Sequence, residues 1–233
     1  MSVSTICLVS PDTFAPRLIG ALQRHSRSVL VQHHDTMGLE APDAMTEVHG
    51  DRLIAFNCPV IFPSVVLERF QHGCYNIHAG SPAYPGRFST CMAIYDAVRQ
   101  FGVTAHAMIA RVDAGPIVAT KWFDVDPQMS RQALESQTAS AMLELFDDLS
   151  SIFVHESSPL PALRIEWSGQ RVCSKSVKQI CNMPPDIDNA ECKRRIRAFA
   201  GLPDIDVCVN IGGYHFSYVD KTMIDPIATK SRK

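Results

Sequence analysis

The sequence lacks long hydrophobic runs and carries almost no net charge. No apolar segment is long enough to span a bilayer, and the first residues do not follow the pattern of a signal peptide. We therefore expect a cytoplasmic protein with no membrane partner. Lysine and arginine (22) nearly balance aspartate and glutamate (24), which gives a formal net charge of −2. This balance argues against a protein that holds long stretches of nucleic acid by neutralising phosphates.

Motifs for structural zinc and for dinucleotides are also missing. None of the eight cysteines forms a Cys-x-x-Cys pair, so we expect reduced, mostly buried thiols rather than a zinc ribbon. No G-x-G-x-x-G follows the first apolar segment, which argues against a dinucleotide cofactor. His33 and His34 are neighbours on a predicted strand and point to opposite faces, so they cannot easily share an ion. The sequence predicts no metal site.

Apolar residues are abundant enough, at 46% of 233 residues, to build a core without cross-links. Short apolar segments alternate with helical patterns. This order predicts an α/β, Rossmann-like fold with a mostly parallel sheet covered by helices. The predicted strands are residues 4–10, 28–34, 51–63 (turning into a loop at Pro59), 74–79 and 103–112. The predicted helices are residues 14–26, 64–73, 88–102 (with Ser89 as N-cap) and 129–153.

The pattern changes near residue 157, and this change predicts a second region. We assign residues 1–156 to the main domain and residues 157–233 to a small C-terminal α+β region. The elements expected there are short strands or loops at 162–167 and 172–180, a helix at 188–201 capped by Asp188 and Glu191, a β-hairpin at 206–220 turning at Gly212-Gly213, and a loose tail.

Polar residues gather at the end of one predicted strand. Asn76 and His78 are two residues apart, so both side chains emerge on the same face. They lie at the C-terminal end of the strand, where open α/β sheets bind ligands. A single histidine at such a place is commonly structural. However, the Gly/Pro-rich segment 79–86 follows directly, and Asp113 precedes a Gly-Pro turn after the next predicted strand. Loops on a rigid sheet often carry function, so this pattern favours a site.

These segments resemble a known family. Asn-x-His, the Gly/Pro-rich loop and the pattern GVT-x-H-x-M…VD-x-GPI resemble the folate-dependent formyltransferases, most strongly over residues 50–125. The resemblance implies that Asn76, His78 and Asp113 are the catalytic trio. It also implies N10-formyltetrahydrofolate as co-substrate, without a metal or redox cofactor. The residues that it places around the folate are Phe56, Cys58, Val60, Ile61, Phe62, Arg111, Val112 and Gly115.

The loop after His78 and the C-terminal region favour one branch of this family. The loop lacks the Leu pair that is common elsewhere, and residues 194–203 and 209–220 resemble the end of enzymes that act on nucleotide-linked amino sugars. We therefore expect a sugar N-formyltransferase. Its acceptor would be a dTDP- or GDP-linked 4-amino-4,6-dideoxy sugar destined for surface polysaccharide, such as lipopolysaccharide O-antigen. The expected substrate-binding residues are Ser10, Asp12, Thr13, Tyr84, Arg87, Lys121, Trp122 and Arg197.

The trio suggests a division of labour. Asn76 and a protonated His78 would donate hydrogen bonds to the carbonyl oxygen under attack, and Asp113 would take the proton of the attacking amine. We expect Asp113 to raise the proton affinity of His78, because an opposite charge nearby favours the charged imidazole. His106 is expected to be structural, with a place on the strand from which it can support the site.

Several alternatives stay open at this level. The chain could be another formyl-folate enzyme: methionyl-tRNA formyltransferase, glycinamide ribonucleotide formyltransferase or formyltetrahydrofolate deformylase. It could also be a folate or sugar-nucleotide binding module without catalysis. As partners we expect two small molecules, the nucleotide-sugar substrate and folate, and no nucleic acid, and a homodimer is allowed.

Overall fold

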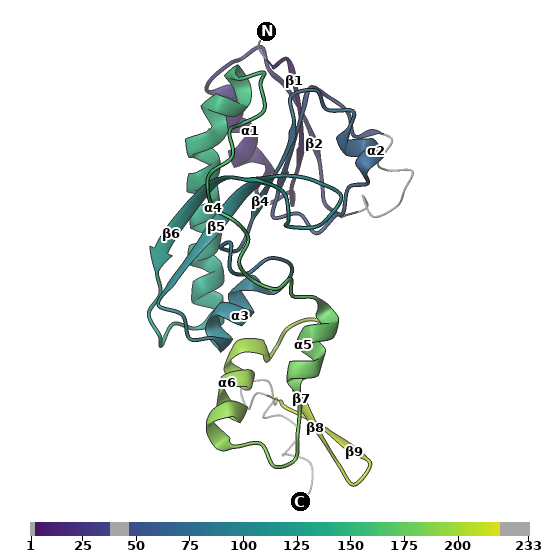
Figure 1. The fold of residues 1–233 in the computed structure, drawn as a ribbon, viewed down its shortest axis with the longest axis vertical. Coiled ribbons are helices and arrows are strands. Elements are labelled where there is room, and N and C mark those ends of the chain that lie inside the picture. Colours follow the sequence, from purple (N-terminus) through teal and green to yellow (C-terminus); the bar gives the residue numbers. More distant parts are fainter. Residues whose placement is uncertain (1–2, 38–46, 220–233) are drawn as a thin grey trace, which may run out of the picture.

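The computed structural model describes residues 3–37 and 47–219. They form a six-stranded sheet with helices and a smaller region at the far end from the N-terminus (Figure 1). The strands are β1 (Thr5–Val9), β2 (Leu30–His34), β3 (Arg52–Phe56), β4 (Cys74–His78), β5 (Gln100–Ala107), β6 (Ile117–Asp124), β7 (Asn182–Met183), β8 (Cys208–Ile211) and β9 (Tyr214–Ser217). The helices are α1 (Ala15–Gln23), α2 (Ser64–Leu67), α3 (Ser89–Tyr95), α4 (Arg131–His155), α5 (Ser174–Cys181) and α6 (Asn189–Phe199).

The central sheet is parallel over four strands and antiparallel at one edge. Its order is β2-β1-β3-β4-β5-β6. The pairs β2–β1, β1–β3 and β3–β4 are parallel, whereas β4–β5 and β5–β6 are antiparallel. The predicted α/β, Rossmann-like fold with a mostly parallel sheet is confirmed.

The sequence-based boundaries are wrong at the antiparallel edge. The helix expected over 88–102 ends at Tyr95, because Ala97 adopts a left-handed conformation with φ of 51°. Its N-cap is Phe88 rather than Ser89. β5 consequently starts earlier than expected, and the sequence pattern does not predict β6 at all. Gly102 permits the close approach of these two strands, since a Cβ there would lie 2.6 Å from a backbone oxygen of β6.

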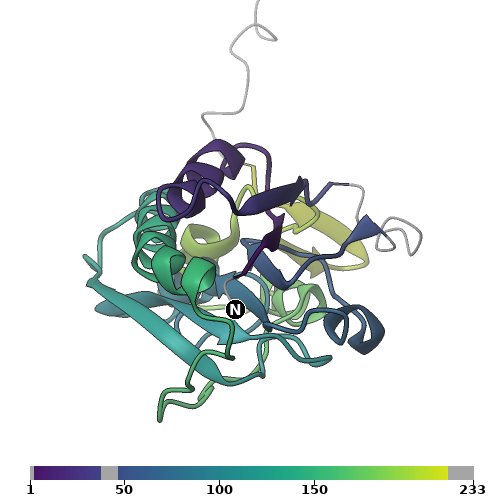
Figure 2. The ribbon, with the colours of Figure 1, turned by 90° about the horizontal axis from the view of Figure 1, so that it is seen from above.

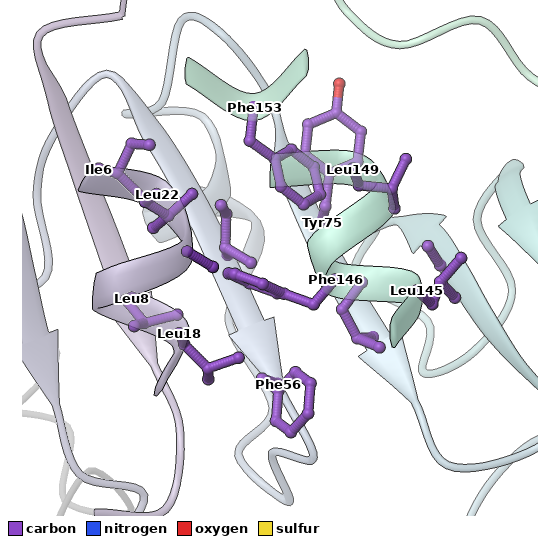
Figure 3. Close-up of a cluster of buried hydrophobic side chains, with 14 of the residues drawn as sticks. Ile6, Leu8, Leu18, Leu22, Phe56, Tyr75, Leu145, Phe146, Leu149 and Phe153 are labelled. Atoms are coloured by element: carbon purple, nitrogen blue, oxygen red, sulfur yellow. The ribbon is translucent and has the colours of Figure 1, made fainter. Parts of the chain in front are cut away.

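Apolar side chains cover both faces of the sheet. On one face, α1 and α4 lie together (Figure 2) and pack over Phe56, whose ring contacts Phe146 of α4 at 5.9 Å between centroids (Figure 3). On the other face, Phe62, Val66 of α2 and Phe70 form a second cluster. Within the described residues, no helix is long and apolar enough to cross a membrane.

Arg52 is a fully buried cation at the start of β3. Its guanidinium donates hydrogen bonds to five backbone carbonyls, four of them at the C-terminal end of α4 and just beyond. The acceptors are the oxygens of His72 (2.9 Å), Ile152 (3.3 Å), Phe153 (2.5 Å), Glu156 (2.7 Å) and Ser158 (3.5 Å). The last carbonyls of a helix lack partners within the helix and carry partial negative charge. Arg52 satisfies them and fixes the end of α4 against the sheet.

The C-terminal region shares a core with the main sheet. Val177 of α5 and Phe199 of α6 belong to the same buried cluster as Ile94 of α3 and Leu134 of α4. This cluster therefore joins residues from both sides of the expected boundary at residue 157, and the division into two domains stays a prediction.

Two of the expected elements in this region are confirmed and one is wrong. Asp188 caps α6 by accepting hydrogen bonds from two backbone N–H groups, and both Gly212 and Gly213 have positive φ at the tip of the β8–β9 hairpin. Residues 172–180, expected as strand or loop, instead contain α5, because Val177 and Cys181 lie one helical turn apart and are both buried. The expected tail lies outside the described residues.

Candidate active site

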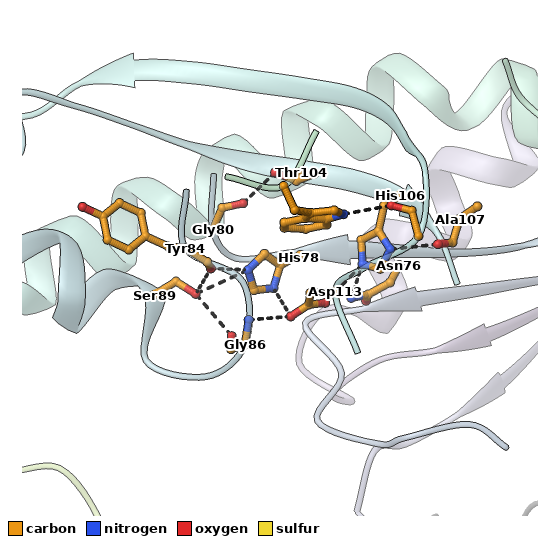
Figure 4. Close-up of polar contacts among 12 residues, drawn as sticks. Asn76, His78, Gly80, Tyr84, Gly86, Ser89, Thr104, His106, Ala107 and Asp113 are labelled. Carbon is orange, nitrogen blue, oxygen red and sulfur yellow. Dashed lines mark hydrogen bonds and ion pairs between the residues drawn. The ribbon is translucent and has the colours of Figure 1, made fainter. Parts of the chain in front are cut away.

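β4 presents two polar side chains in the middle of the sheet. Asn76 and His78 alternate with buried Ile77, so they emerge on the same face, as predicted (Figure 4). The imidazole of His78 is 8% exposed. Its Nε2 lies 2.9 Å from the backbone oxygen of Tyr84, which fixes a proton on that nitrogen and turns Nδ1 toward the carboxylate of Asp113.

Asp113 reaches the two histidines of the site from the loop between β5 and β6. Its Oδ2 lies 3.5 Å from Nδ1 of His78 and accepts a hydrogen bond from the backbone N–H of Gly86 (2.7 Å). Its Oδ1 lies 3.2 Å from Nε2 of His106. One carboxylate thus bridges two imidazoles and also holds the Gly/Pro-rich loop after β4 (Figure 4). The structure brings the predicted trio together; the catalytic roles stay predictions.

His106 belongs to the constellation, although the sequence predicted only a structural or supporting role for it. It is opposite Asn76 in the β4–β5 register, and its Nε2 lies 3.3 Å from Nδ2 of Asn76. Its Nδ1 donates to the backbone oxygen of Ala107 at 2.9 Å. The signal that could have found it is the antiparallel pairing of these strands, which places the two side chains side by side.

Burial dominates the electrostatics of His78. Burial lowers the pKa of His78, and it outweighs the opposing effects of the Asp113 carboxylate and of the hydrogen bond to Tyr84. Asp113 thus raises the proton affinity of His78, as expected, but burial has the larger effect and the pKa of His78 lies below its ordinary value. Burial alone would raise the pKa of Asp113, but the hydrogen bond with His106 and the charge effects of both histidines together lower it. A neutral imidazole beside an ionised carboxylate is the resting state near neutral pH.

The lowered pKa of His78 predicts a pH-dependent stability. Below the ordinary histidine pKa of about 6.5, the unfolded chain takes up a proton that folded His78 resists. Stability should therefore fall as the pH drops from about 6.5 toward the lower folded pKa. We expect the Tm difference between about pH 7.5 and pH 5 to be smaller in His78→Gln than in the unmodified protein. The exposed His49→Gln serves as control, and an equal reduction in both variants would contradict the assignment.

A cavity of about 610 Å³ opens over these residues. Its size is typical of sites for small molecules. The predicted trio and His106 line it, as do seven of the other predicted site residues: Cys58, Val60, Ile61, Phe62, Arg87, Arg111 and Val112. Lining residues that the sequence reading missed include Phe14, Glu135, Thr138, Met142, Arg171 and Cys173. Three arginines, Arg87, Arg111 and Arg171, line the cavity, and none of them has an ion-pair partner in the described part of the chain, which suits an anionic ligand.

The other predicted residues are not brought to the cavity. Phe56 is in the core, and Gly115 packs against β5 so closely that a Cβ would lie 1.9 Å from the oxygen of Ala107. Tyr84 turns its hydroxyl to Asp96, and Lys121 pairs with two carboxylates of α4. The remaining predicted residues that do not line the cavity are Ser10, Asp12, Thr13, Trp122 and Arg197. Arg197 instead donates to the backbone oxygens of Pro127 and Met129.

Comparison with known proteins identifies a family for this chain. Residues 20–147 match the family model described as formyl transferase. The methionyl-tRNA formyltransferase of Thermotoga neapolitana is 30% identical over 121 residues, which are 50% of this chain and 39% of that enzyme. The chain thus matches well under half the length of this relative.

Solved structures of similar fold cover more of the chain. A sugar N-formyltransferase of Shewanella has a TM-score of 0.71 at 17% identity, with 92% of this chain and 96% of that one covered. An N-formyltransferase of Helicobacter canadensis, in complex with folinic acid and dTDP-3-aminofucose, has a TM-score of 0.63 at 16% identity, with 89% and 84% covered. At these identities the likeness concerns the fold. Because the family model matches more than half of the sequence, the chain belongs to the formyl transferase family.

Proposed function

We propose that this protein is a sugar N-formyltransferase. It would move the formyl group of N10-formyltetrahydrofolate to the amine of a nucleotide-linked amino-deoxy sugar, with a dTDP- or GDP-4-amino-4,6-dideoxy sugar for surface polysaccharide as the specific acceptor. The observation that carries this proposal is the constellation of Asn76, His78 and Asp113 at the wall of a cavity. The expected cytoplasmic location and the homodimer stay predictions.

The constellation can manage the charge and protons of formyl transfer. Negative charge develops on the carbonyl oxygen when an amine attacks, and a polar group already in place stabilises it without reorganisation. The amide of Asn76 is suited to this, because one end of it contacts His106 and its other end, Oδ1 as assigned, has no hydrogen-bond partner in the described structure. Amide oxygen and nitrogen are assigned by their partners. A second proton on His106, at Nε2 in addition to the one that Nδ1 donates to Ala107, would turn the amide oxygen toward Nε2 and leave the N–H₂ of Asn76 free to donate into the cavity.

The proton of the attacking amine has a path through His78. Neutral His78 exposes its Nδ1 lone pair on the side of Asp113, so it can accept a proton, and the ionised carboxylate of Asp113 stabilises the imidazolium that forms. The same proton can then be returned to the leaving nitrogen. The three arginines of the cavity, which have no ion-pair partner among the described residues, favour ligands with negative charge, such as a diphosphate or the carboxylates of folate.

Two kinds of similarity bear on the acceptor. The folds of the Shewanella and Helicobacter canadensis enzymes, named for sugars or solved with a dTDP-sugar, extend over nearly all of this chain. The sequence relative is a methionyl-tRNA formyltransferase, so formyl transfer to methionyl-tRNA is the second candidate.

The proposal is tested with purified protein and N10-formyltetrahydrofolate against a panel of acceptors. The panel contains dTDP- and GDP-amino sugars, methionyl-tRNA, glycinamide ribonucleotide and a sample without acceptor. Mass spectrometry should detect a sugar nucleotide heavier by one formyl group. If formylated product forms only with methionyl-tRNA or only with glycinamide ribonucleotide, that molecule is the acceptor and the proposed sugar nucleotide is not. Folate deformylation without acceptor indicates a hydrolase, and folate binding without any turnover indicates a binding module.

A substitution at Gly80 should disable the site by displacing His78. A Cβ at residue 80 would lie 2.6 Å from Nε2 of His78 and 2.8 Å from the side chain of Ser89. Because both neighbours are buried, Gly80→Ala should shift the imidazole and reduce formyl transfer by about 100-fold or more, with the protein still folded. The matched control is Gly20→Ala on α1, where nothing lies within 4 Å of the added carbon. Equal rates in the two variants would refute this reading of the loop.

A further inference from the structure

A segment of the C-terminal half crosses back over the site. We call residues 163–172, between α4 and α5, the strap. Its backbone N–H groups donate to the first residue of β6 from Leu163 (2.7 Å) and to the Gly/Pro-rich loop of residues 79–87 from Ser168 and Val172 (3.0 Å each). The strap therefore ties the loop that follows β4 to the strand that follows the Asp113 loop.

The strap and the Gly/Pro-rich loop approach each other backbone to backbone. A Cβ on Gly169 would lie 1.8 Å from the oxygen of Ala83, and one on Gly86 would lie 2.3 Å from the oxygen of Val172. Gly86 is also the residue whose N–H donates to Asp113. A displacement of the strap would therefore move Gly86, whose N–H donates to the carboxylate of Asp113.

Trp167 of the strap contacts both histidines of the site. Its indole lies edge-on to His78, with 5.8 Å between ring centroids and 65° between planes, and to His106, with 5.1 Å and 84°. Its Nε1–H donates to the backbone oxygen of Gly115 at 2.8 Å. Gly115 belongs to the loop that carries Asp113. A single side chain thus contacts two of the imidazoles and the loop of the carboxylate.

We propose that Trp167 is a positioning residue, which holds His78, His106 and the Asp113 loop in one arrangement. The hydrogen bonds of His78 and His106 direct their nitrogen atoms, but the contacts to Asp113 are 3.5 and 3.2 Å long and do not by themselves fix the ring planes. Edge-on aromatic contact restricts that rotation. The indole also keeps water from the imidazole of His78. This role of Trp167 concerns the same site as the proposed function, and only its kinetic test depends on that function.

The kinetic test compares three variants. Trp167→Leu removes the ring and the N–H donor, Trp167→Phe keeps a ring, and Ile165→Ala changes an exposed residue of the same strap. We expect kcat to fall about 10- to 100-fold in Trp167→Leu, with KM for both substrates within about twofold, because geometry at the reacting centre is lost while binding surfaces remain. Trp167→Phe should recover most of the loss. A rise of KM at unchanged kcat would make Trp167 a substrate contact and overturn the proposal.

The second test needs no turnover. The titration of His78 is followed by NMR in the protein without substrates, with His78→Gln and His106→Gln to assign the signals. The groups that face His78 are Asp113 and His106, and the other charged residues that line the cavity are Arg87, Arg111, Arg171 and Glu135. In Trp167→Leu, water reaches His78, so its pKa should move up toward the ordinary value. An unchanged titration overturns the proposal even if the proposed acceptor is confirmed, and a shifted one supports it even if another acceptor is found.

Discussion

Asp113→Asn is expected to reduce formyl transfer by about a thousandfold. The substitution keeps the size of the side chain and removes the charge that two imidazoles share. Without that charge, a protonated His78 is no longer stabilised, and in one orientation the new amide N–H₂ faces the N–H of Gly86, which is also a donor. Losing a general base or the group that orients it typically costs about 10²- to 10⁴-fold in rate.

The control for this prediction separates chemistry from folding. Asp147→Asn changes a carboxylate of α4 that pairs with Arg17 and Arg24 and contacts no residue of the constellation in the described structure. It should leave the rate unchanged. Initial rates, circular dichroism and folate binding are measured for both variants. Near-normal turnover in folded Asp113→Asn would remove the carboxylate from the proposed mechanism.

The second large effect concerns stability and comes from Arg52. Arg52→Met fills a similar volume but leaves the carbonyls at the end of α4 without donors in a buried place. Stranding buried polar groups of this kind costs about 3–5 kcal/mol. For a chain of this size, that corresponds to a fall in Tm of about 10 °C. Arg52→Lys should lie between, because one ammonium cannot reach the carbonyls that a planar guanidinium spans.

Thermal unfolding followed by circular dichroism measures this effect. The matched control is Arg17→Met on α1, whose side chain is 57% exposed and pairs with Asp147; exposed pairs of this kind contribute about 1 kcal/mol or less. If Arg52→Met and Arg17→Met shift the Tm by the same small amount, the buried guanidinium does not fix the end of α4 as described.

The fold was predictable from the sequence where local patterns agree with the final packing. β1, and β3 after Arg52, are continuous apolar strands buried on both faces, so their composition alone identifies them. α6 and its cap at Asp188 follow from short-range hydrogen bonds, which the sequence specifies directly. The antiparallel edge was not predictable in this way. β6 is half-exposed, and its partner β5 begins in residues that also fit a helix, so only long-range pairing decides their structure.

The residues of the site were also predictable only in part. Asn76 and His78 share a strand, and Asp113 is marked by its motif, so sequence could bring them together. For His106 the sequence predicted only a supporting place, and it gave no signal for Trp167, because each acquires its contacts through tertiary structure: His106 from the register against β4, and Trp167 from the path of the strap. The direction of the His78 pKa was also inaccessible, since it depends on how completely the folded chain excludes water.

The path of the strap has a consequence for how the protein is made. Synthesis runs from the N-terminus, so all six strands of the main sheet and the whole of α4 leave the ribosome before residue 167 does. Until residue 167 has left the ribosome, the indole cannot pack against His78 and His106, so this part of the centre of the sheet is not yet packed. The contacts of Trp167 with the two histidines therefore form late in translation, after the strands that carry these histidines have been completed.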